Sequence, residues 1–309
     1  GPAIVLSFVF AGIACALAEL KRSKPGLKRA VLKLNEGFSG EGNAIFGFKG
    51  APKGKGLKSW ILNKLPALSF EARGMTLDTY LGKFREMGGI AEEFIEGAMK
   101  RSPSAQLRVD PLGNLAAIST HDQVLGGQNS QIFLGCRFPA DAAYRLGIQE
   151  LGRRAGEILA EKGVLGRFGI DFISVAGKEG WSHYAIEINL RKGGTTHPFL
   201  MLQFLTDGRY EPATGLFLAP SGAPCFYYAS DNLQSERYRG LTPSDLIDIA
   251  AIHGLHFNAA SREGVVFHLI GALSEFGKLG ILSIANTAER AFALYRRSVE
   301  ILDRESAPS

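Results

Sequence analysis

Two apolar runs near the middle of the chain, residues 168–175 and 181–190, are separated by a short gap, and this pattern predicts a β-hairpin. Side chains alternate between the two faces of a strand. Glu187, Asn189 and Arg191 therefore share one face of the second strand. The other face receives Tyr184, Ile186, Ile188 and Leu190. A polar row backed by an apolar row predicts a lined site above a core.

Closing the hairpin over residues 176–180 sets Asp171 opposite or diagonal to Glu187. Facing positions on a sheet lie about 4.5–8 Å apart, so these carboxylates and the Asn189 carboxamide are expected to converge. These three side chains supply oxygen ligands only, which suits Mg²⁺. Arg191, next on the same face, is expected to hold an anionic oxygen with two hydrogen bonds. The alternative is an exposed strand face that carries polar residues by chance.

A second candidate site surrounds a glycine-rich loop, residues 36–43, between the apolar runs 30–35 and 44–48, which are expected to pair as a β-hairpin. Its glycines free the backbone to turn several N–H groups toward one point, which favours phosphate, and Ser39 adds a hydroxyl donor. Lys33 lies inside the apolar run before the loop, where an unpaired ammonium is costly. A ligand phosphate would be a natural partner. The alternative is a plain hairpin turn whose lysine reaches solvent.

The rest of the chain predicts a mixed α/β (α+β) fold. Helices are expected near residues 10–22, 76–87, 140–162 and 287–305, and strands near 90–95 and 105–120. The expected divisions are residues 1–100, 101–221 and a mainly helical last part, 222–309.

Composition bounds the class of function. The 309 residues carry a net charge of +5, and the basic side chains form no stripe between aromatics, so nucleic acid is not favoured. Three distant cysteines without a CxxC motif favour a reducing, cytoplasmic compartment. Residues 2–18 are nearly all apolar, and a buried strand leading into a helix is expected there rather than a membrane segment. A targeting segment is the alternative.

Five more polar residues are weighed as lining the site or as ordinary strand positions. His121, Asp122 and Gln123 follow an expected strand. Arg108 and Asp110 alternate along another. The sequence leaves both interpretations open.

The order of these features resembles that of ATP-grasp enzymes: a strand-borne lysine with a glycine loop, an acidic strand at residues 91–97, and then the metal hairpin. More narrowly, the chain resembles the pheganomycin-type peptide ligases, which are carboxylate–amine ligases. The residues that carry this resemblance are 31–43, 187–198, 267–268 and 277–280. The resemblance implies an ATP-grasp fold with two α+β subdomains that clasp ATP, followed by a mainly helical C-terminal domain.

The resemblance also implies nucleotide contacts. Lys33 would contact the phosphates and serve catalysis. The loop would cover the phosphates as a lid through Ser39, Gly40, Gly42 and Asn43. The strand that meets adenine would hold Glu92 or Glu93 with Phe94 and Ile95, and Glu96 would contact the ribose.

For the chemistry, the resemblance implies that Asp171, Glu187 and Asn189 hold Mg²⁺. It also implies that Arg191 stabilises an acyl phosphate or the tetrahedral intermediate. The expected activity joins a carboxylate and an amine, each a small molecule or a peptide, at the expense of ATP. Homo-oligomerisation stays open. Two alternatives are an ATP-grasp kinase of small molecules and a noncatalytic nucleotide-binding module.

One departure from the family pattern concerns a second nucleotide lysine, which ATP-grasp enzymes carry some tens of residues before the glycine-loop strand. Lys21, Lys24 and Lys28 lie too close to that strand. The domain that precedes the ATP-grasp fold in these enzymes is not found in this sequence either. We therefore expect the chain alone to bind nucleotide weakly or to be inactive.

Overall fold

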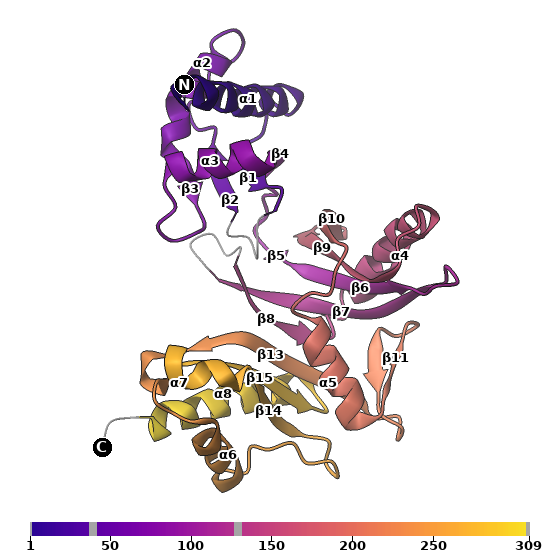
Figure 1. The fold of residues 1–309 in the computed structure, drawn as a ribbon. Helices are drawn as coiled ribbons and strands as arrows, with labels where there is room; N and C mark the ends of the chain where they lie inside the picture. The colour runs from indigo at the N-terminus through magenta and orange to yellow at the C-terminus, as the bar shows by residue number, and fades with distance from the viewer. Residues whose placement is uncertain (1, 37–41, 127–131, 307–309) are drawn as a thin grey trace. The chain divides into compact units, whose positions relative to one another are not determined.

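The computed structural model describes residues 2–36, 42–126 and 132–306, with the backbone alone for residues 2–8 (Figure 1). The chain divides into two compact units. Unit 1 comprises Gly1–Glu96 and Leu125–Phe133, and unit 2 comprises Gly97–Val124 and Leu134–Ser309. Each unit combines helices with antiparallel strands, which confirms the predicted mixed α/β class.

Unit 1 is built on a four-stranded sheet in the order β3-β2-β1-β4. Its strands are β1 (Arg29–Leu34), β2 (Asn43–Gly47), β3 (Ser69–Phe70) and β4 (Gly89–Glu93). Its helices are α1 (Pro2–Ser23), α2 (Leu57–Lys64) and α3 (Leu77–Met87), with a 3-10 turn at Leu65–Ala67. The predicted pairing of the two strands that flank the glycine loop is confirmed, with Lys33 opposite Asn43.

The alternation of β1 decides which of its side chains enter the core of unit 1. Leu32 and Leu34 are buried there with side chains from all three helices. Lys33 therefore points to the opposite face of the sheet. The hydroxyl of Tyr80, a fully buried residue of α3, donates to the carbonyls of Leu32 at 3.1 Å and Gly42 at 3.3 Å. This side chain ties α3 to β1 and to the end of the glycine loop.

Residues 2–18, expected to begin as a strand, are helical throughout. This part of α1 buries Ile13, Ala14, Leu17 and Ala18 in the core of unit 1. Alanine and leucine, which recur along the segment, are strong helix formers. In the part of the chain that the structure describes, no helix is both long and apolar enough to cross a membrane.

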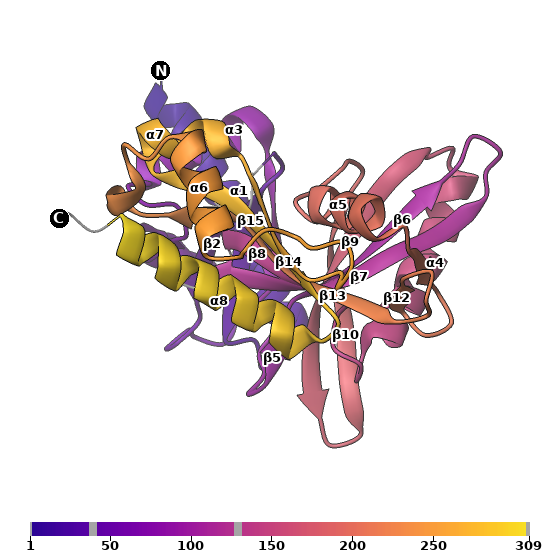
Figure 2. The same cartoon turned by 90° about the horizontal axis from the view of Figure 1, so that it is seen from below.

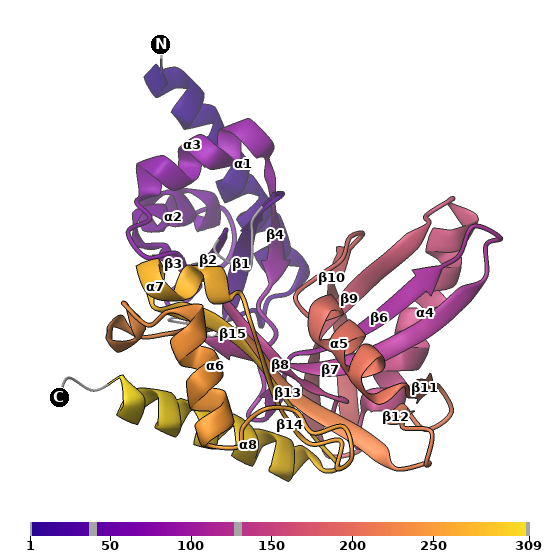
Figure 3. The same ribbon diagram turned by 60° about the horizontal axis from the view of Figure 1, so that its bottom comes forward.

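Unit 2 contains a long antiparallel sheet whose main path runs β10-β9-β6-β7-β8-β13-β12-β11, with β5 beside β9 and β15 between β13 and β14 (Figures 2 and 3). Its first strands are β5 (Lys100–Arg101), β6 (Pro103–Val109), β7 (Leu115–Gly126), β8 (Ile132–Phe138), β9 (Gly166–Gly177) and β10 (Gly180–Asn189). Of these, β7 belongs to unit 2 up to Val124 and β8 from Leu134. The later strands are β11 (Arg209–Glu211), β12 (Leu216–Leu218), β13 (Pro224–Gln234), β14 (Gly264–His268) and β15 (Lys278–Ala285). The helices are α4 (Arg145–Glu161), α5 (Thr196–Thr206), α6 (Pro243–Ile252), α7 (Leu273–Phe276) and α8 (Ala288–Glu305), with 3-10 turns at Glu236–Tyr238 and Ile270–Ala272.

Helix α4 covers one face of β6 and β9, and two glycines let it approach closely. A Cβ atom on Gly152 would lie 3.0 Å from the Cβ of Ala105 and 3.3 Å from Leu107. One on Gly156 would lie 3.0 Å from Leu115. The core beneath the helix includes Phe168, Ile170 and Phe172 of β9. The opposite face of β9 is therefore the one that carries Asp171.

The stretch from residue 222 onward contains the expected final helix and also three strands that the sequence patterns did not indicate. Helix α8 follows the N-cap Thr287, whose hydroxyl accepts a hydrogen bond from the Arg290 amide at 3.1 Å. Strand β15 lies between β13 and β14 and is buried from residue 279 to 285. Because a strand buried on both faces shows no alternation, its apolar run is hard to distinguish from a buried helix. Figure 2 shows α6 and α8 beside these strands.

Replacing Gly152 by valine is expected to lower the free energy of unfolding by about 1–3 kcal/mol, because the new side chain must displace Ala105 and Leu107 in a packed interface. Chemical denaturation measures this change. Gly82 in α3 is the matched control, since a Cβ there meets nothing within 4 Å. Gly82→Ala is expected to raise the free energy of unfolding by about 0.5–1 kcal/mol. A stabilising Gly152→Val would contradict the close approach of α4.

Candidate functional site

The hairpin β9–β10 brings together the acidic residues singled out from the sequence. The predicted pairing is confirmed, because Glu187 lies directly opposite Asp171 and Asn189 lies opposite Gly169. Residues directly opposite each other share a face of the sheet. The Asn189 Nδ2 donates to Asp171 Oδ2 at 3.1 Å. Two carboxylates and a carboxamide thus meet on one face.

A β-bulge at Ile186 changes which side chains of β10 share a face, because the pairing with β9 skips this residue. Residues between the bulge and the hairpin turn are therefore reversed relative to a regular strand. Tyr184 lies on the face of Asp171 and Glu187, and its predicted place in an apolar row with Ile188 is wrong. An aromatic ring that is 45% exposed consequently stands on the face of the carboxylates.

Arg191 lies beyond the strand, since β10 ends at Asn189. Its side chain is exposed, and Nη1 donates to the Lys192 carbonyl at 3.3 Å. The prediction that strand alternation places Arg191 in line with Glu187 is therefore wrong. Its role in catalysis stays a proposal.

Strand β7 contributes a further residue to the hairpin site. The Gln123 Nε2 donates to Asp171 Oδ1 at 2.9 Å. Because Asn189 occupies Oδ2, each carboxylate oxygen of Asp171 is held by an amide donor. A carboxylate oxygen accepts about two hydrogen bonds, so this arrangement orients Asp171 and leaves it able to bind a cation. The structure thereby assigns Gln123, an open candidate in the sequence, to the site.

The acidic residues next to these candidates have structural partners. Asp122 accepts hydrogen bonds from the Tyr144 hydroxyl at 2.6 Å and from the Asp141 amide at 2.9 Å. Asp110 accepts from the amide and the side chain of Asn114, both at 2.9 Å, and so closes the turn between β6 and β7. Both carboxylates therefore stabilise local structure.

His121 is completely buried, and its Nε2 lies 2.6 Å from the Tyr227 hydroxyl. Burial lowers the pKa of His121 to about 3, because the charged imidazolium would lose its hydration. The imidazole is consequently neutral near neutral pH and packs against Phe138 and Tyr227.

In unit 1, Lys33 has a carboxylate partner. Its Nζ lies 2.6 Å from Glu92 Oε2, and the two side chains are 21% and 33% exposed. The register sets Lys33 opposite Asn43 and Glu92 opposite Val31, so all four share the face away from the helices. The lysine and one of the acids predicted to meet a nucleotide are therefore in direct contact.

The other acids predicted to meet the nucleotide are also paired. Glu93 forms an ion pair with Lys24. Glu96 accepts two hydrogen bonds from Arg29, at 2.9 and 2.8 Å. The Arg29 guanidinium lies 3.8 Å from the ring centre of Phe94. These contacts hold the segment after β4 to the start of β1, although exposed ion pairs contribute only about 0–1 kcal/mol each.

Of the predicted phosphate lid, the structure describes only the last residues, Gly42 and Asn43. Ser39 and Gly40 lie outside the described residues. The Gly42 carbonyl accepts from the Leu34 amide at 3.2 Å, and Asn43 begins β2.

The donors of the hairpin fit a hard cation. Asp171, Glu187 and Asn189 offer carboxylate and carboxamide oxygens, and no sulfur or imidazole takes part. Within the described ranges, no group of three or more His, Cys, Asp or Glu side chains is placed to hold a metal ion. A pair of carboxylates suits Mg²⁺, which usually keeps waters and substrate phosphates among its ligands.

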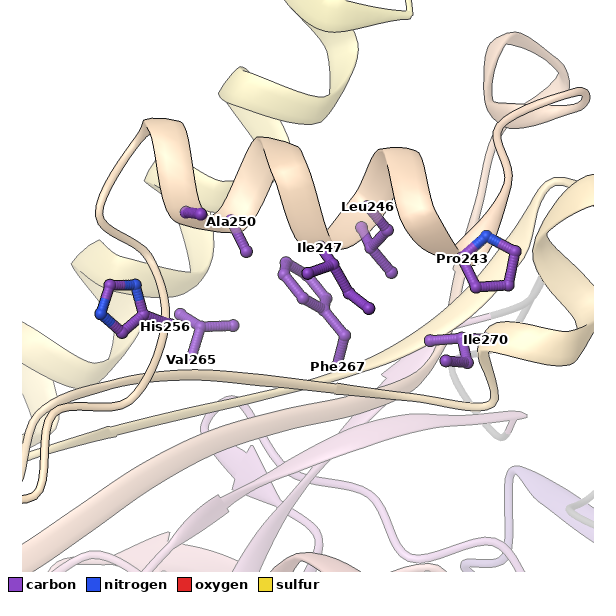
Figure 4. Close-up of a pocket in the computed structure, with 9 residues that line it drawn as sticks. Pro243, Leu246, Ile247, Ala250, His256, Val265, Phe267 and Ile270 are labelled. Atoms are coloured by element: carbon purple, nitrogen blue, oxygen red, sulfur yellow. The ribbon is translucent and has the colours of Figure 1, made fainter.

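An apolar groove of about 600 Å³ lies elsewhere in unit 2, between α6 and β14 (Figure 4). Its walls carry Leu246, Ile247, Ala250, Val265, Phe267 and Ile270, with Pro243 and His256 toward its two ends. No carboxylate lines it. The groove is therefore distinct in chemistry from the hairpin site.

Residues 59–212 match a family described as "IQCH-like, ATP-grasp", and residues 245–298 match the "PGM1 C-terminal domain". The L-propargylglycine–L-glutamate ligase of Streptantibioticus cattleyicolor is 34% identical over 241 residues, which cover 78% of this chain and 48% of the ligase. The IQ motif-containing protein H of Danio rerio is 21% identical over 242 residues, which cover 74% of this chain and 22% of that protein.

A biotin carboxylase of Campylobacter jejuni, solved as a β-γ-ATP complex, has the same fold, with a TM-score of 0.56 and 16% identity over 92% of this chain and 60% of the carboxylase. The chain belongs to the ATP-grasp superfamily. This ATP-grasp chain spans about half the length of the ligase that it matches.

Mild acid is expected to destabilise the ATP-grasp chain through His121. Its folded pKa of about 3 lies below the ordinary value of about 6.5, so between these values the unfolded chain binds a proton that the folded chain does not. This residue should lower the free energy of unfolding by up to about 1.4 kcal/mol for each pH unit below about 6.5.

Denaturation in urea between about pH 6.5 and pH 5 measures this slope, above the range in which most carboxylates titrate. His121→Gln should flatten it, because the titrating group is gone. Tyr227→Phe is the control, since it removes the hydrogen-bond partner and keeps the imidazole. Parallel slopes for the wild type and His121→Gln would contradict the effect of burial.

Proposed function

We propose that this chain is the nucleotide-binding part of an ATP-dependent carboxylate–amine ligase that works through an acyl phosphate. The observation that carries the proposal is the convergence of Asp171, Glu187 and Asn189, in a chain that is 34% identical to a ligase over 241 residues. The name of that ligase specifies propargylglycine and glutamate. For this chain we propose the class of reaction, with a carboxylate and an amine as substrates.

Lys33 is proposed to meet the nucleotide phosphates. Its contact with Glu92 supports this role, because the carboxylate keeps the ammonium in place on an apolar strand, where an unpaired charge would be costly. A phosphate would then contact Lys33 together with Glu92, or take the place of Glu92 beside the lysine. Residues 39–43 are proposed to cover the phosphates, and residues 92–96 to border the adenine and the ribose.

Asp171, Glu187 and Asn189 are proposed to hold Mg²⁺, with Gln123 keeping Asp171 in orientation. The ion, when bound, supplies positive charge against the phosphate oxygens. Arg191, close in sequence to Asn189 and exposed, is proposed to hold an oxygen of the acyl phosphate.

The proposed reaction proceeds in two steps. A carboxylate oxygen of the first substrate attacks the γ-phosphorus of ATP, the bond to the β,γ-bridging oxygen breaks, and ADP and an acyl phosphate form. The amine nitrogen of the second substrate then attacks the carbonyl carbon, the bond to the phosphate oxygen breaks, and the nitrogen loses a proton. An amide and inorganic phosphate result. Because no covalent bond to the protein forms, positioning and electrostatics can supply the catalysis.

Calorimetric titration with ATP tests the nucleotide site. Binding is expected to need Mg²⁺, and the double variant Glu187→Ala, Asn189→Ala should weaken it at least about tenfold, because charge-assisted contacts of this kind are worth about 1.5–3 kcal/mol. The matched control is Glu179→Ala, which removes an exposed carboxylate from the turn of the same hairpin. Folded protein that binds ATP equally with or without the two side chains would refute the metal hairpin.

A further inference from the structure

The sheet face that carries Asp171 also carries a pair of arginines. Arg108 on β6 lies directly opposite Arg167 on β9, so the two guanidinium groups share that face. Like charges in directly opposite positions destabilise a sheet. Partial burial, and after it the charge of Arg108, lowers the pKa of Arg167. None of the ion pairs among the described residues includes either arginine.

A cavity of about 10 Å³ adjoins Arg167 and has two buried hydroxyl groups in its wall. Ser119 and Thr195 are 2% and 5% exposed, and in the part of the chain that is described neither hydroxyl has a hydrogen-bond partner. An unsatisfied buried hydroxyl costs about 1–3 kcal/mol. A space of this size holds one water molecule. The hydroxyls are therefore set to meet a small polar group beside the arginine.

The N-terminus of helix α5 adds positive electrostatic potential beside this cavity. Thr195 is its N-cap, yet the threonine hydroxyl makes no capping hydrogen bond. Thr196, the first residue of the helix, also lines the cavity. The N-terminus of an α-helix carries a partial positive charge that favours anions. Arg167 and the helix N-terminus thus border one cavity that no acid lines, and Arg108 lies opposite Arg167 on the sheet.

The arginine pair lies at a distance from the metal hairpin along the same strand. Arg167, Gly169 and Asp171 alternate on one face of β9, and a strand rises about 3.3 Å per residue, so the first and last are roughly 13 Å apart. The carboxamide of Gln106 covers the gap, since a Cβ on Gly169 would lie 2.7 Å from its Nε2. An anion bound by the arginines is consequently not the group that reacts at Asp171.

We propose that Arg108, Arg167 and the N-terminus of α5 form a site for a nonreacting carboxylate of a substrate. The guanidinium groups hold its two oxygens, and Ser119 and Thr195 reach it through the water in the cavity. The anion site stands on the geometry of unit 2 alone, whereas its assignment to a ligase substrate rests on the proposed function. The substrate class it selects is an acid with a second carboxylate remote from its reacting group.

Titration with glutarate, without ATP or Mg²⁺ and at constant ionic strength, tests the site by the rise in the melting temperature. The wild type should bind glutarate, and Arg108→Met and Arg167→Met should each weaken binding at least about tenfold, because each loses a charge-assisted hydrogen-bond donor. Arg296→Met, which removes an exposed arginine of α8, should bind as the wild type does. Unchanged glutarate binding in both Arg108→Met and Arg167→Met would overturn the proposal, as would no binding by the wild type.

Two further readouts separate a binding role from a structural one. In buffer without glutarate, Arg167→Met should melt at the same temperature as the wild type or higher, because repulsion from Arg108 is removed. A lower melting temperature together with intact glutarate binding would mean that the arginine serves the fold. Inorganic phosphate is the second probe, and binding of phosphate without glutarate would overturn the carboxylate assignment. Since no nucleotide is present, the result does not depend on whether the chain binds ATP.

Discussion

Strand β9 pairs with β6 over residues 166–171 on one edge and with β10 over residues 169–177 on the other, and this double pairing fixes the hairpin site. Asp171 lies opposite Ser104 on one side and Glu187 on the other. A shift of one residue in either pairing would turn the apolar residues of a strand from the core to the opposite face. The burial of Phe168 and Ile170 under α4 therefore holds the carboxylates in register without any ligand.

In each unit, a charged side chain of the candidate site is held by polar side chains of neighbouring strands. In unit 1 the Lys33 ammonium is held by Glu92, and in unit 2 the Asp171 carboxylate is held by amides from Gln123 and Asn189. Each charged group is thereby oriented before any ligand arrives, which reduces the free energy needed to order it on binding. The arginine pair of β6 and β9 differs, because its charges repel each other and none of the ion pairs among the described residues includes either arginine.

The hairpin and the glycine-loop strands could be predicted because both follow a period of two and are joined by short connections. The bulge at Ile186 could not, since an extra residue leaves no mark in a run of apolar residues. The contact of Gln123 with Asp171 depends on the strand order β9-β6-β7, which places β7 near the hairpin. The local sequence pattern does not contain this order. The arginine pair could not be predicted for the same reason. Arg108 and Arg167 become neighbours only through the register of two strands that lie far apart in the sequence.

The bulge in β10 divides the hairpin into two parts that can be engineered separately. Glu187 and Asn189 lie on the side joined to the helix α5, whereas Tyr184 and the turn at residues 178–179 lie on the other side. A change in length at the turn alters the reach of the hairpin tip and leaves the carboxylates where they are. Deleting Ile186 would remove the bulge and leave Tyr184 opposite Ile173, so that both the tyrosine and the acids keep their partners. The hairpin tip is thus a suitable position for a fluorescent label that reports on the site without occupying it.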